Sequence, residues 1–136
     1  MAFDYGTKRV GIAVTDPLQL IATALDTVHA KDVLAYVKGY VDRETVSMFV
    51  VGEPRQLDGS ESESAQHVRG FVRTLRRTFP TIPVETIDER FTSKMASASI
   101  ALSGMARKKR QDKALIDSVS AVLILQSYLE KRDFQR

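Results

Sequence analysis

Acidic side chains stand at three places in this sequence, within or directly after apolar segments. Asp4 interrupts an apolar strand pattern near the start of the chain. Asp88 and Glu89 follow a second such pattern, and Asp117 falls in the apolar register of a C-terminal helix. Carboxylates from separate elements can converge on hard divalent cations such as Mg²⁺, as metal-assisted hydrolysis of a phosphodiester requires. These residue types at these positions therefore predict a metal-dependent nuclease site.

Each of these acids also has a purely structural interpretation. Asp4 could accept hydrogen bonds from backbone amides in the turn that follows it. Asp88 or Glu89 could pair with Arg90 or cap a following helix. Asp117 could pair with a lysine, because a buried carboxylate needs a compensating partner of some kind. The spacing alone leaves both interpretations open for every one of them.

The elements that must position these acids follow from hydrophobic periodicity. Strands are predicted at 3–5, 10–14, 22–28, 47–52 and 84–87, the first two forming a hairpin around a Gly-Thr-Lys turn. Helices are predicted after Asp32, which should cap the first of them, and over 68–75, 93–104 and about 113–131. The order βββαβαβαα predicts an α/β fold, with one domain spanning residues 1–136.

Composition restricts the class of protein. The chain is 43% hydrophobic and 27% charged, close to the average for a globular domain. It has no cysteine, which excludes disulfides and thiolate chemistry and suits a reducing compartment. No apolar run reaches the ~20 residues of a membrane-spanning helix, and no signal peptide is recognisable. We therefore expect a cytoplasmic protein.

Basic residues form two groups within a net charge of +3. The first group comprises Arg69, Arg73, Arg76 and Arg77. It could attract a polyanion, but its spacing favours the solvated face of a helix. The second follows Gly104 and is harder to explain structurally; it comprises Arg107, Lys108, Lys109 and Arg110. Because clustered positive charge attracts polyanions by counterion release, the second group is predicted to bind nucleic acid.

Four ordered motifs carry a resemblance to a known family. They are Phe-Asp-Tyr-Gly-Thr-Lys-Arg-Val-Gly-Ile-Ala-Val at 3–14, Val-Val-Gly-Glu-Pro with Asp-Gly at 50–59, Asp-Glu-Arg-Phe-Thr-Ser at 88–93, and Lys-Ala-Leu-Ile-Asp-Ser-Val-Ser-Ala-Val-Leu-Ile-Leu-Gln at 113–126. In this order they resemble the YqgF/RuvX family over nearly the whole chain. The resemblance implies an RNase H-like fold, with a five-stranded mixed sheet flanked by helices on both faces.

The resemblance also implies a function. Members are described as nucleases that mature the 5′ end of pre-16S rRNA, and as relatives of RuvC-type Holliday junction resolvases. We therefore expect a hydrolase that uses Mg²⁺ or Mn²⁺ in a two-metal type of phosphodiester cleavage. A junction resolvase acting in DNA recombination is one alternative, and a non-catalytic RNA-binding ribosome-assembly factor is another. The expected partners are structured RNA or branched DNA and a pre-ribosomal particle, with the protein a monomer or a homodimer.

Site residues carry over by position. Asp4, Asp88, Glu89 and Asp117 match the family's acids, and of these Asp4, Asp88 and Asp117 are the predicted metal ligands, with Glu89 as the alternative to Asp88. Glu53 departs from the family, which commonly has an apolar residue there, so it is either a further ligand or a solvent-facing residue without a role.

Basic residues near the acids are expected to assist them. Lys8, Arg9 and Arg90 could neutralise the scissile phosphate. His29 and His67 are not expected to take part, because they fall on elements away from the acids.

Overall fold

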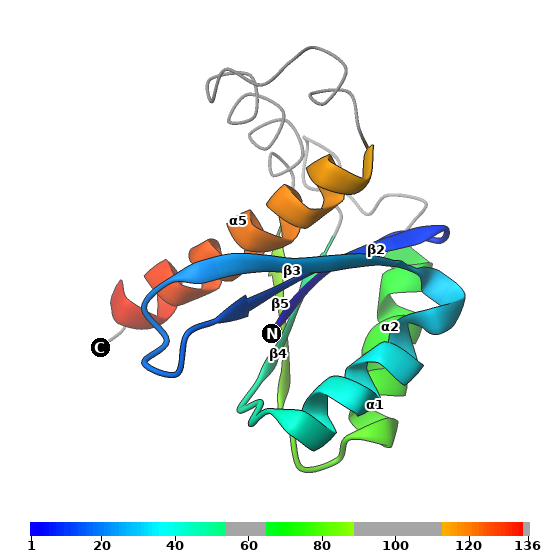
Figure 1. Ribbon diagram of the computed structural model, residues 1–136, viewed down its shortest axis with the longest axis horizontal. Coiled ribbons are helices and arrows are strands. Elements are labelled where there is room, and N and C mark those ends of the chain that lie inside the picture. The colour runs from blue at the N-terminus through cyan, green and yellow to red at the C-terminus, as the bar shows by residue number, and fades with distance from the viewer. Residues whose placement is uncertain (54–64, 89–112, 135–136) are drawn as a thin grey trace.

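A five-stranded sheet forms the centre of the molecule. The computed structural model describes residues 1–53, 65–88 and 113–134 (Figure 1). The strands are β1 (Ala2–Tyr5), β2 (Arg9–Thr15), β3 (Ala22–His29), β4 (Phe49–Glu53) and β5 (Val84–Asp88). The helices are the 3₁₀ turn η1 (Ala30–Asp32), α1 (Val33–Arg43), α2 (Ala65–Thr78) and α5 (Lys113–Phe134).

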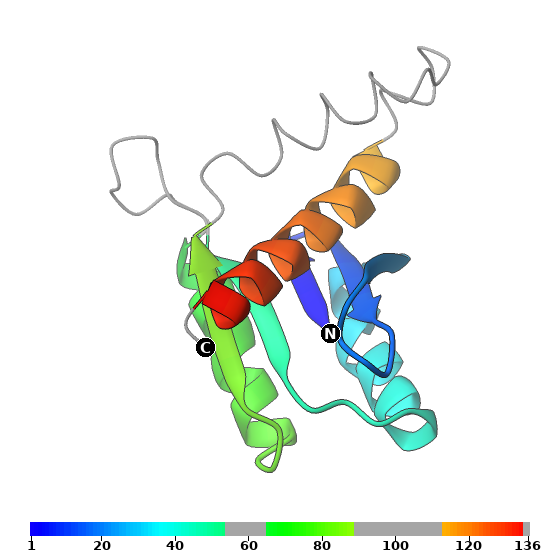
Figure 2. The ribbon, with the colours of Figure 1, turned by 90° about the vertical axis from the view of Figure 1, so that its left-hand side faces the viewer.

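The sheet is mixed, and its strand order is β3-β2-β1-β4-β5. β1 pairs antiparallel with β2, and β2 antiparallel with β3, whereas β1, β4 and β5 run parallel to one another. Helices α1 and α2 cover one face, and α5 crosses the other (Figures 1 and 2). The predicted α/β class and five-stranded mixed sheet are confirmed. The helix predicted at 93–104 lies outside the described residues.

The larger core fills the space between the sheet and helices α1 and α2. Alternate strand residues point into it, so Phe3 on β1 and Phe49 on β4 are fully buried there. The Phe3 ring centroid lies 5.7 Å from that of Phe49 and 5.3 Å from that of Phe71 on α2. Aromatic rings at such separations add to the free energy gained from burying their area. This cluster fixes α2 against β1 and β4.

A smaller core lies on the opposite face, under α5. Ala2, Ala13 and Val50 of the sheet contact Ala121, Ile124 and Leu125 of the helix. The alanines carry only a methyl group, so the helix backbone can approach the strands closely. At the C-terminal end of α5, the Arg132 guanidinium donates a 3.3 Å hydrogen bond to the backbone oxygen of Gln19, in the β2–β3 loop. Helix α5 is thereby attached to the sheet and its β2–β3 loop between Ala121 and Arg132.

The start of α1 differs from the prediction. Asp32 makes no side-chain capping hydrogen bond, so the expected cap is wrong. The 3₁₀ turn η1 precedes α1, and Asp32 has helical dihedral angles (φ −103°, ψ −6°), whereas a capping residue normally has extended ones. His29 is extended, and its Nδ1 accepts a 3.1 Å hydrogen bond from the Lys31 amide. The cap thus precedes the turn, three residues earlier than expected.

Among the described residues, no helix combines the length and the apolar character that a membrane-spanning helix requires.

Candidate active site

Three acidic residues gather at one edge of the sheet, where β1, β4 and β5 end. We call this the carboxyl edge. Phe3 is registered with Val51, so Asp4, the next residue of β1, lies beside the end of β4. Glu53 and Asp88 are direct partners in the β4–β5 ladder. Strand ends of this kind are where open α/β sheets place their ligands.

Asp4 lies on the face of the sheet that α5 covers. Side chains alternate along a strand, so Asp4 shares a face with Ala2, which packs against α5. Its direct partner on β2 is Gly11, and Arg9 lies two residues from that partner, on the same face. Diagonal positions of this type are within reach of long side chains. Asp4 and Arg9 are both half-buried, so a carboxylate and a guanidinium share this corner of the site.

Asp88 lies on the opposite face. It shares a face with Val84, which belongs to the larger core, and with its ladder partner Glu53. Glu53 and Thr86 line a groove against α2, which places this side of both strands beneath that helix. Asp88 is exposed, whereas Glu53 is half-buried. The sheet therefore separates Asp88 from Asp4, although both residues lie at the carboxyl edge.

The C-terminal helix α5 carries Asp117, the last of the acids that the sequence predicted for the site. α5 begins at Lys113 and so includes Asp117, one helical turn before Ala121 in the smaller core. The predicted helix thus crosses the same face of the sheet as Asp4. Ser120, also in this stretch, is fully buried, and its hydroxyl has no hydrogen-bond partner among the described residues. Sequence reasoning missed Ser120, although a serine inside an apolar helical run is a recognisable signal.

The remaining predicted site residues lie outside the described part of the chain. They are Glu89, Arg90, Arg107, Lys108, Lys109 and Arg110. Among the side chains that the structure describes, which do not include that of Asp117, no three His, Cys, Asp or Glu residues form a group able to hold a metal ion. The donor chemistry of the half-buried Asp4 still fits a hard cation, because carboxylate oxygen is the ligand that Mg²⁺ prefers.

The turn between β1 and β2 holds Asp4 and Arg9 in their places. The Gly6 amide donates a 2.9 Å hydrogen bond to the Arg9 carbonyl oxygen, closing the hairpin. The carbonyl oxygen of Lys8 accepts a 3.0 Å hydrogen bond from the Ala30 amide, which ties the turn to η1. The Lys8 side chain is exposed at this corner. A Cβ atom on Gly6 would lie only 2.8 Å from the Arg9 oxygen, so the turn accepts no larger residue without shifting.

Replacing Gly6 with Ala is therefore expected to destabilise the protein by about 1–3 kcal/mol, the usual range for overpacking. Gly39 provides a matched control, because a Cβ atom there meets nothing within 4 Å in the middle of α1. Gly39→Ala should stabilise by up to about 1 kcal/mol through helix propensity. Urea unfolding of both variants measures the difference. Equal effects of the two substitutions would show that the Gly6 contact does not restrict the turn.

The two histidines are exposed. His29 ends β3 and caps η1, and His67 lies on the side of α2 that faces η1 and α1, where it lines a groove with Lys31 and Leu34. Neither belongs to the carboxyl-edge group formed by Asp4, Glu53 and Asp88.

Comparison with known proteins gives one consistent picture. A family model described as RuvX, Holliday junction resolvase, matches residues 1–131. A protein of Porphyromonas gingivalis named "Putative pre-16S rRNA nuclease" is 50% identical over 133 residues, which cover 98% of this chain and 96% of that one. Proteins of the same name from Parabacteroides distasonis and Bacteroides thetaiotaomicron are 49% and 47% identical, over 99% and 98% of this chain and 96% and 97% of theirs.

Proposed function

Since the chain belongs to the RuvX family, we propose that it is a metal-dependent nuclease that processes the 5′ end of pre-16S rRNA in the cytoplasm. The observation that carries the proposal is the position of Asp4. Its half-buried carboxylate lies at the carboxyl edge, on the face crossed by α5, in a chain that is 50% identical to a relative named for this activity. Carboxylate oxygen in that position is a suitable ligand for a hard divalent cation.

The proposed metal ligands are Asp4, Asp117 and one acid of the Asp88-Glu89 pair. We favour Glu89 over Asp88, because Asp88 faces α2 while Asp4 faces α5. When bound, Mg²⁺ or Mn²⁺ ions supply Lewis-acid stabilisation of the charge that develops on the reacting phosphate, in a two-metal type of hydrolysis.

The chain's own basic residues orient the phosphate. Arg9 lies on the same face as Asp4, and its planar guanidinium suits two parallel hydrogen bonds to phosphate oxygens. Lys8, exposed on the β1–β2 turn, adds a second positive charge at this corner. Together they lower the electrostatic cost of bringing a polyanion to an edge that carries three carboxylates.

A second candidate function is resolution of Holliday junctions, because the matching family model is described by that activity. A resolvase cuts two strands symmetrically, which requires a two-fold dimer with two sites. Cleavage of a four-way DNA junction by a dimer would support this function, whereas cleavage of RNA by a monomer would support rRNA processing.

Metal removal tests the proposal. The substrate is an end-labelled RNA that spans the 5′ end of pre-16S rRNA, incubated with Mg²⁺, with Mn²⁺, or with EDTA. We expect cleavage with either metal, at least a 100-fold loss of rate in EDTA, and recovery when metal is restored, because the ions stabilise the transition state. A four-way DNA junction is treated in parallel. Binding of the RNA without cleavage under any metal condition would instead support a non-catalytic assembly factor.

A further inference from the structure

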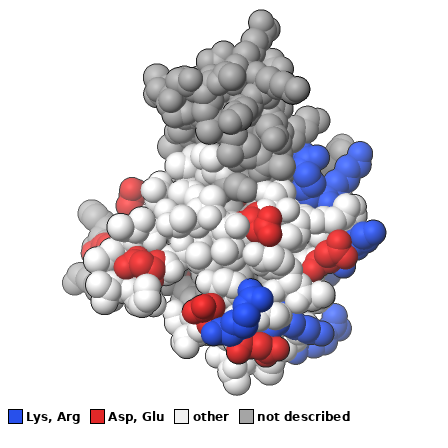
Figure 3. Space-filling model, viewed as in Figure 1, with Lys and Arg blue, Asp and Glu red and all other residues white. Residues whose placement is uncertain are grey.

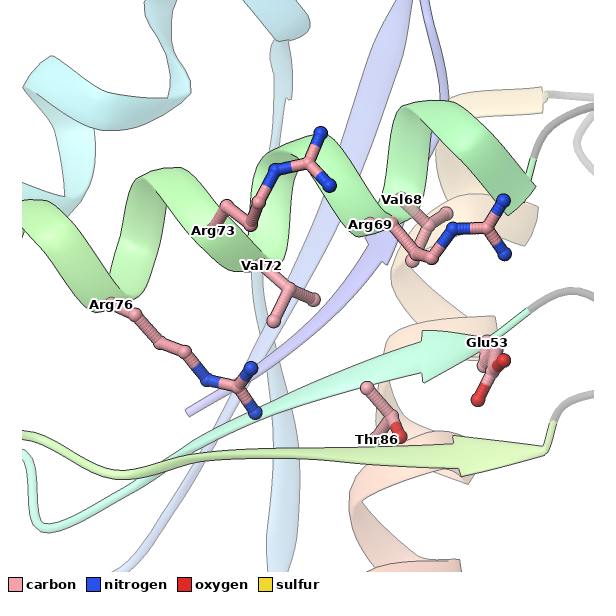
Figure 4. A pocket seen from close by; sticks show the side chains of 7 residues that line it. All are labelled: Glu53, Val68, Arg69, Val72, Arg73, Arg76 and Thr86. Carbon is pink, nitrogen blue, oxygen red and sulfur yellow. The ribbon is translucent and has the colours of Figure 1, made fainter.

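A groove with a volume of about 340 Å³ lies between α2 and strands β4 and β5 (Figure 4). We call it the α2 groove. It is lined by Glu53, Val68, Arg69, Val72, Arg73, Arg76 and Thr86. Three of these residues are arginines, one turn apart along the helix, and all three are exposed. The groove is therefore open to solvent and rimmed by positive charge.

The groove starts at the carboxyl edge and runs away from it. One end is marked by Glu53, the last residue of β4, which lies near the Arg69 end of the helix in Figure 4. At the other end, the Arg76 guanidinium donates a 3.3 Å hydrogen bond to the backbone oxygen of Val84, the first residue of β5. At 1.5 Å per residue, the row from Arg69 to Arg76 extends over roughly 10 Å. The Glu53 end of the groove thus lies at the carboxyl edge, on the opposite face of the sheet from Asp4.

The charge on α2 is of one sign. Between Ala65 and Thr78 the helix carries four arginines and no acidic residue. The solvated face of a helix more often combines both signs, because like charges three and four residues apart destabilise it. Among the described residues, no carboxylate forms an ion pair with Arg73 or Arg77. A bound polyanion would offset this repulsion.

Positive charge also gathers on one side of the molecule. In Figure 3 the Lys and Arg residues of the visible face lie mainly on its right-hand side, the side that carries α1 and α2 in Figure 1. Acidic residues are interspersed there, so the whole side is not uniformly basic. Along the α2 groove the helix wall carries only positive charge, and the one carboxylate of the lining is that of Glu53 on β4.

We propose that the α2 groove binds the phosphodiester backbone of the RNA strand that flanks the cleavage site. The identity of that strand rests on the proposed function. Arg69, Arg73 and Arg76 contact successive phosphates, and the strand passes over the carboxyl edge from the α5 face to the α2 face. Arginine suits this role because its five N–H donors in a planar fork match phosphate oxygens, and Arg76 keeps donors free beyond its bond to Val84. Such contacts position the strand without reading its sequence.

The test compares Arg73→Ala with Arg77→Ala. Both residues are exposed arginines on α2, but only Arg73 lines the groove, so the two variants lose the same charge from the same helix. Binding of a fluorescent single-stranded RNA of about 20 nucleotides is measured in EDTA, at 50 to 200 mM salt. A DNA strand of the same sequence is measured beside it. Thermal unfolding of each variant shows that the helix is intact.

For Arg73→Ala we expect affinity to fall on the order of fivefold, and the slope of log affinity against log salt to fall by about 0.7, the value for one lost phosphate contact on a single strand. Arg77→Ala should stay within about twofold of the wild type. Equal losses in the two variants, or no loss in either, would overturn the groove proposal. A similar loss of affinity for RNA and for DNA is expected from backbone contacts. A normal affinity of Arg73→Ala for both nucleic acids would overturn the groove proposal.

The binding measurement is independent of cleavage. If the wild type cleaves pre-16S rRNA and Arg73→Ala binds normally, the groove proposal fails while the proposed function stands. If no RNA is cleaved but Arg73→Ala alone binds weakly, the groove stands and the nuclease assignment fails.

Discussion

Asp4→Asn is expected to lower the rate of pre-16S rRNA cleavage by at least about 100-fold, because loss of a supporting residue around a metal site already costs 10- to 100-fold. Asparagine has nearly the shape of aspartate, so the strand and its pairing with Gly11 should persist. The lost negative charge removes the proposed metal ligand on the α5 face. RNA affinity in EDTA should be unchanged or slightly increased, since one repulsive charge is gone. Single-turnover cleavage assays and binding titrations measure the two effects separately.

Asp88→Asn is the matched control for this change. It is the same substitution at the same edge of the sheet, but on the face that α2 covers. We expect it to retain more than about one tenth of the wild-type rate, because a residue outside the metal site supplies less than a direct ligand. Equal, severe losses from both substitutions would contradict the assignment of the site to the α5 face. Full activity of Asp4→Asn would contradict the proposed role of Asp4 itself.

Phe49→Ala is expected to reduce the free energy of unfolding by about 3–5 kcal/mol, the range for truncating a buried phenylalanine. Phe49 is fully buried, and its ring centroid lies 5.7 Å from that of Phe3 and 5.3 Å from that of Phe79. Truncation leaves a cavity at the centre of the larger core that these rigid rings cannot close. Because a domain of this size has about 5–15 kcal/mol of total stability, the variant should unfold at much lower urea concentration.

Leu18→Ala controls for the loss of apolar side-chain volume. Leu18 is 75% exposed in the β2–β3 loop, so its truncation should change stability by less than about 0.5 kcal/mol. The loop itself is held by Asp16, whose carboxylate accepts 2.8 Å hydrogen bonds from the amides of Ile21 and Leu20. These bonds lower the pKa of Asp16, the one to Ile21 most. Similar destabilisation by Leu18→Ala and Phe49→Ala would show that the larger core does not dominate stability.

The sequence by itself determined the elements and the family. Short β-favouring or apolar runs bounded by turn residues predicted the strands, and three- and four-residue spacing predicted α1, α2 and α5, because these signals depend only on neighbours along the chain. The cap predicted at Asp32 is the exception. It is wrong because a 3₁₀ turn lies between the end of β3 and α1, so the capping residue is His29 at the end of β3. Four motifs in order were enough to identify the family, which the comparisons confirmed.

Only the tertiary structure decided which residues share a face at the carboxyl edge. Asp4 and Asp88 both follow apolar strand patterns, and the sequence grouped them in one site. The register of β4 with β5 instead sets Asp88 beside Glu53, under α2, while Asp4 faces α5. From the sequence, the α2 arginines were predicted to form the solvated face of a helix. In the structure, strands β4 and β5 form the opposite wall of a groove that these arginines line. Strand pairing and helix placement bring together residues that are tens of positions apart in the sequence. Local periodicity therefore does not determine which of them share a face.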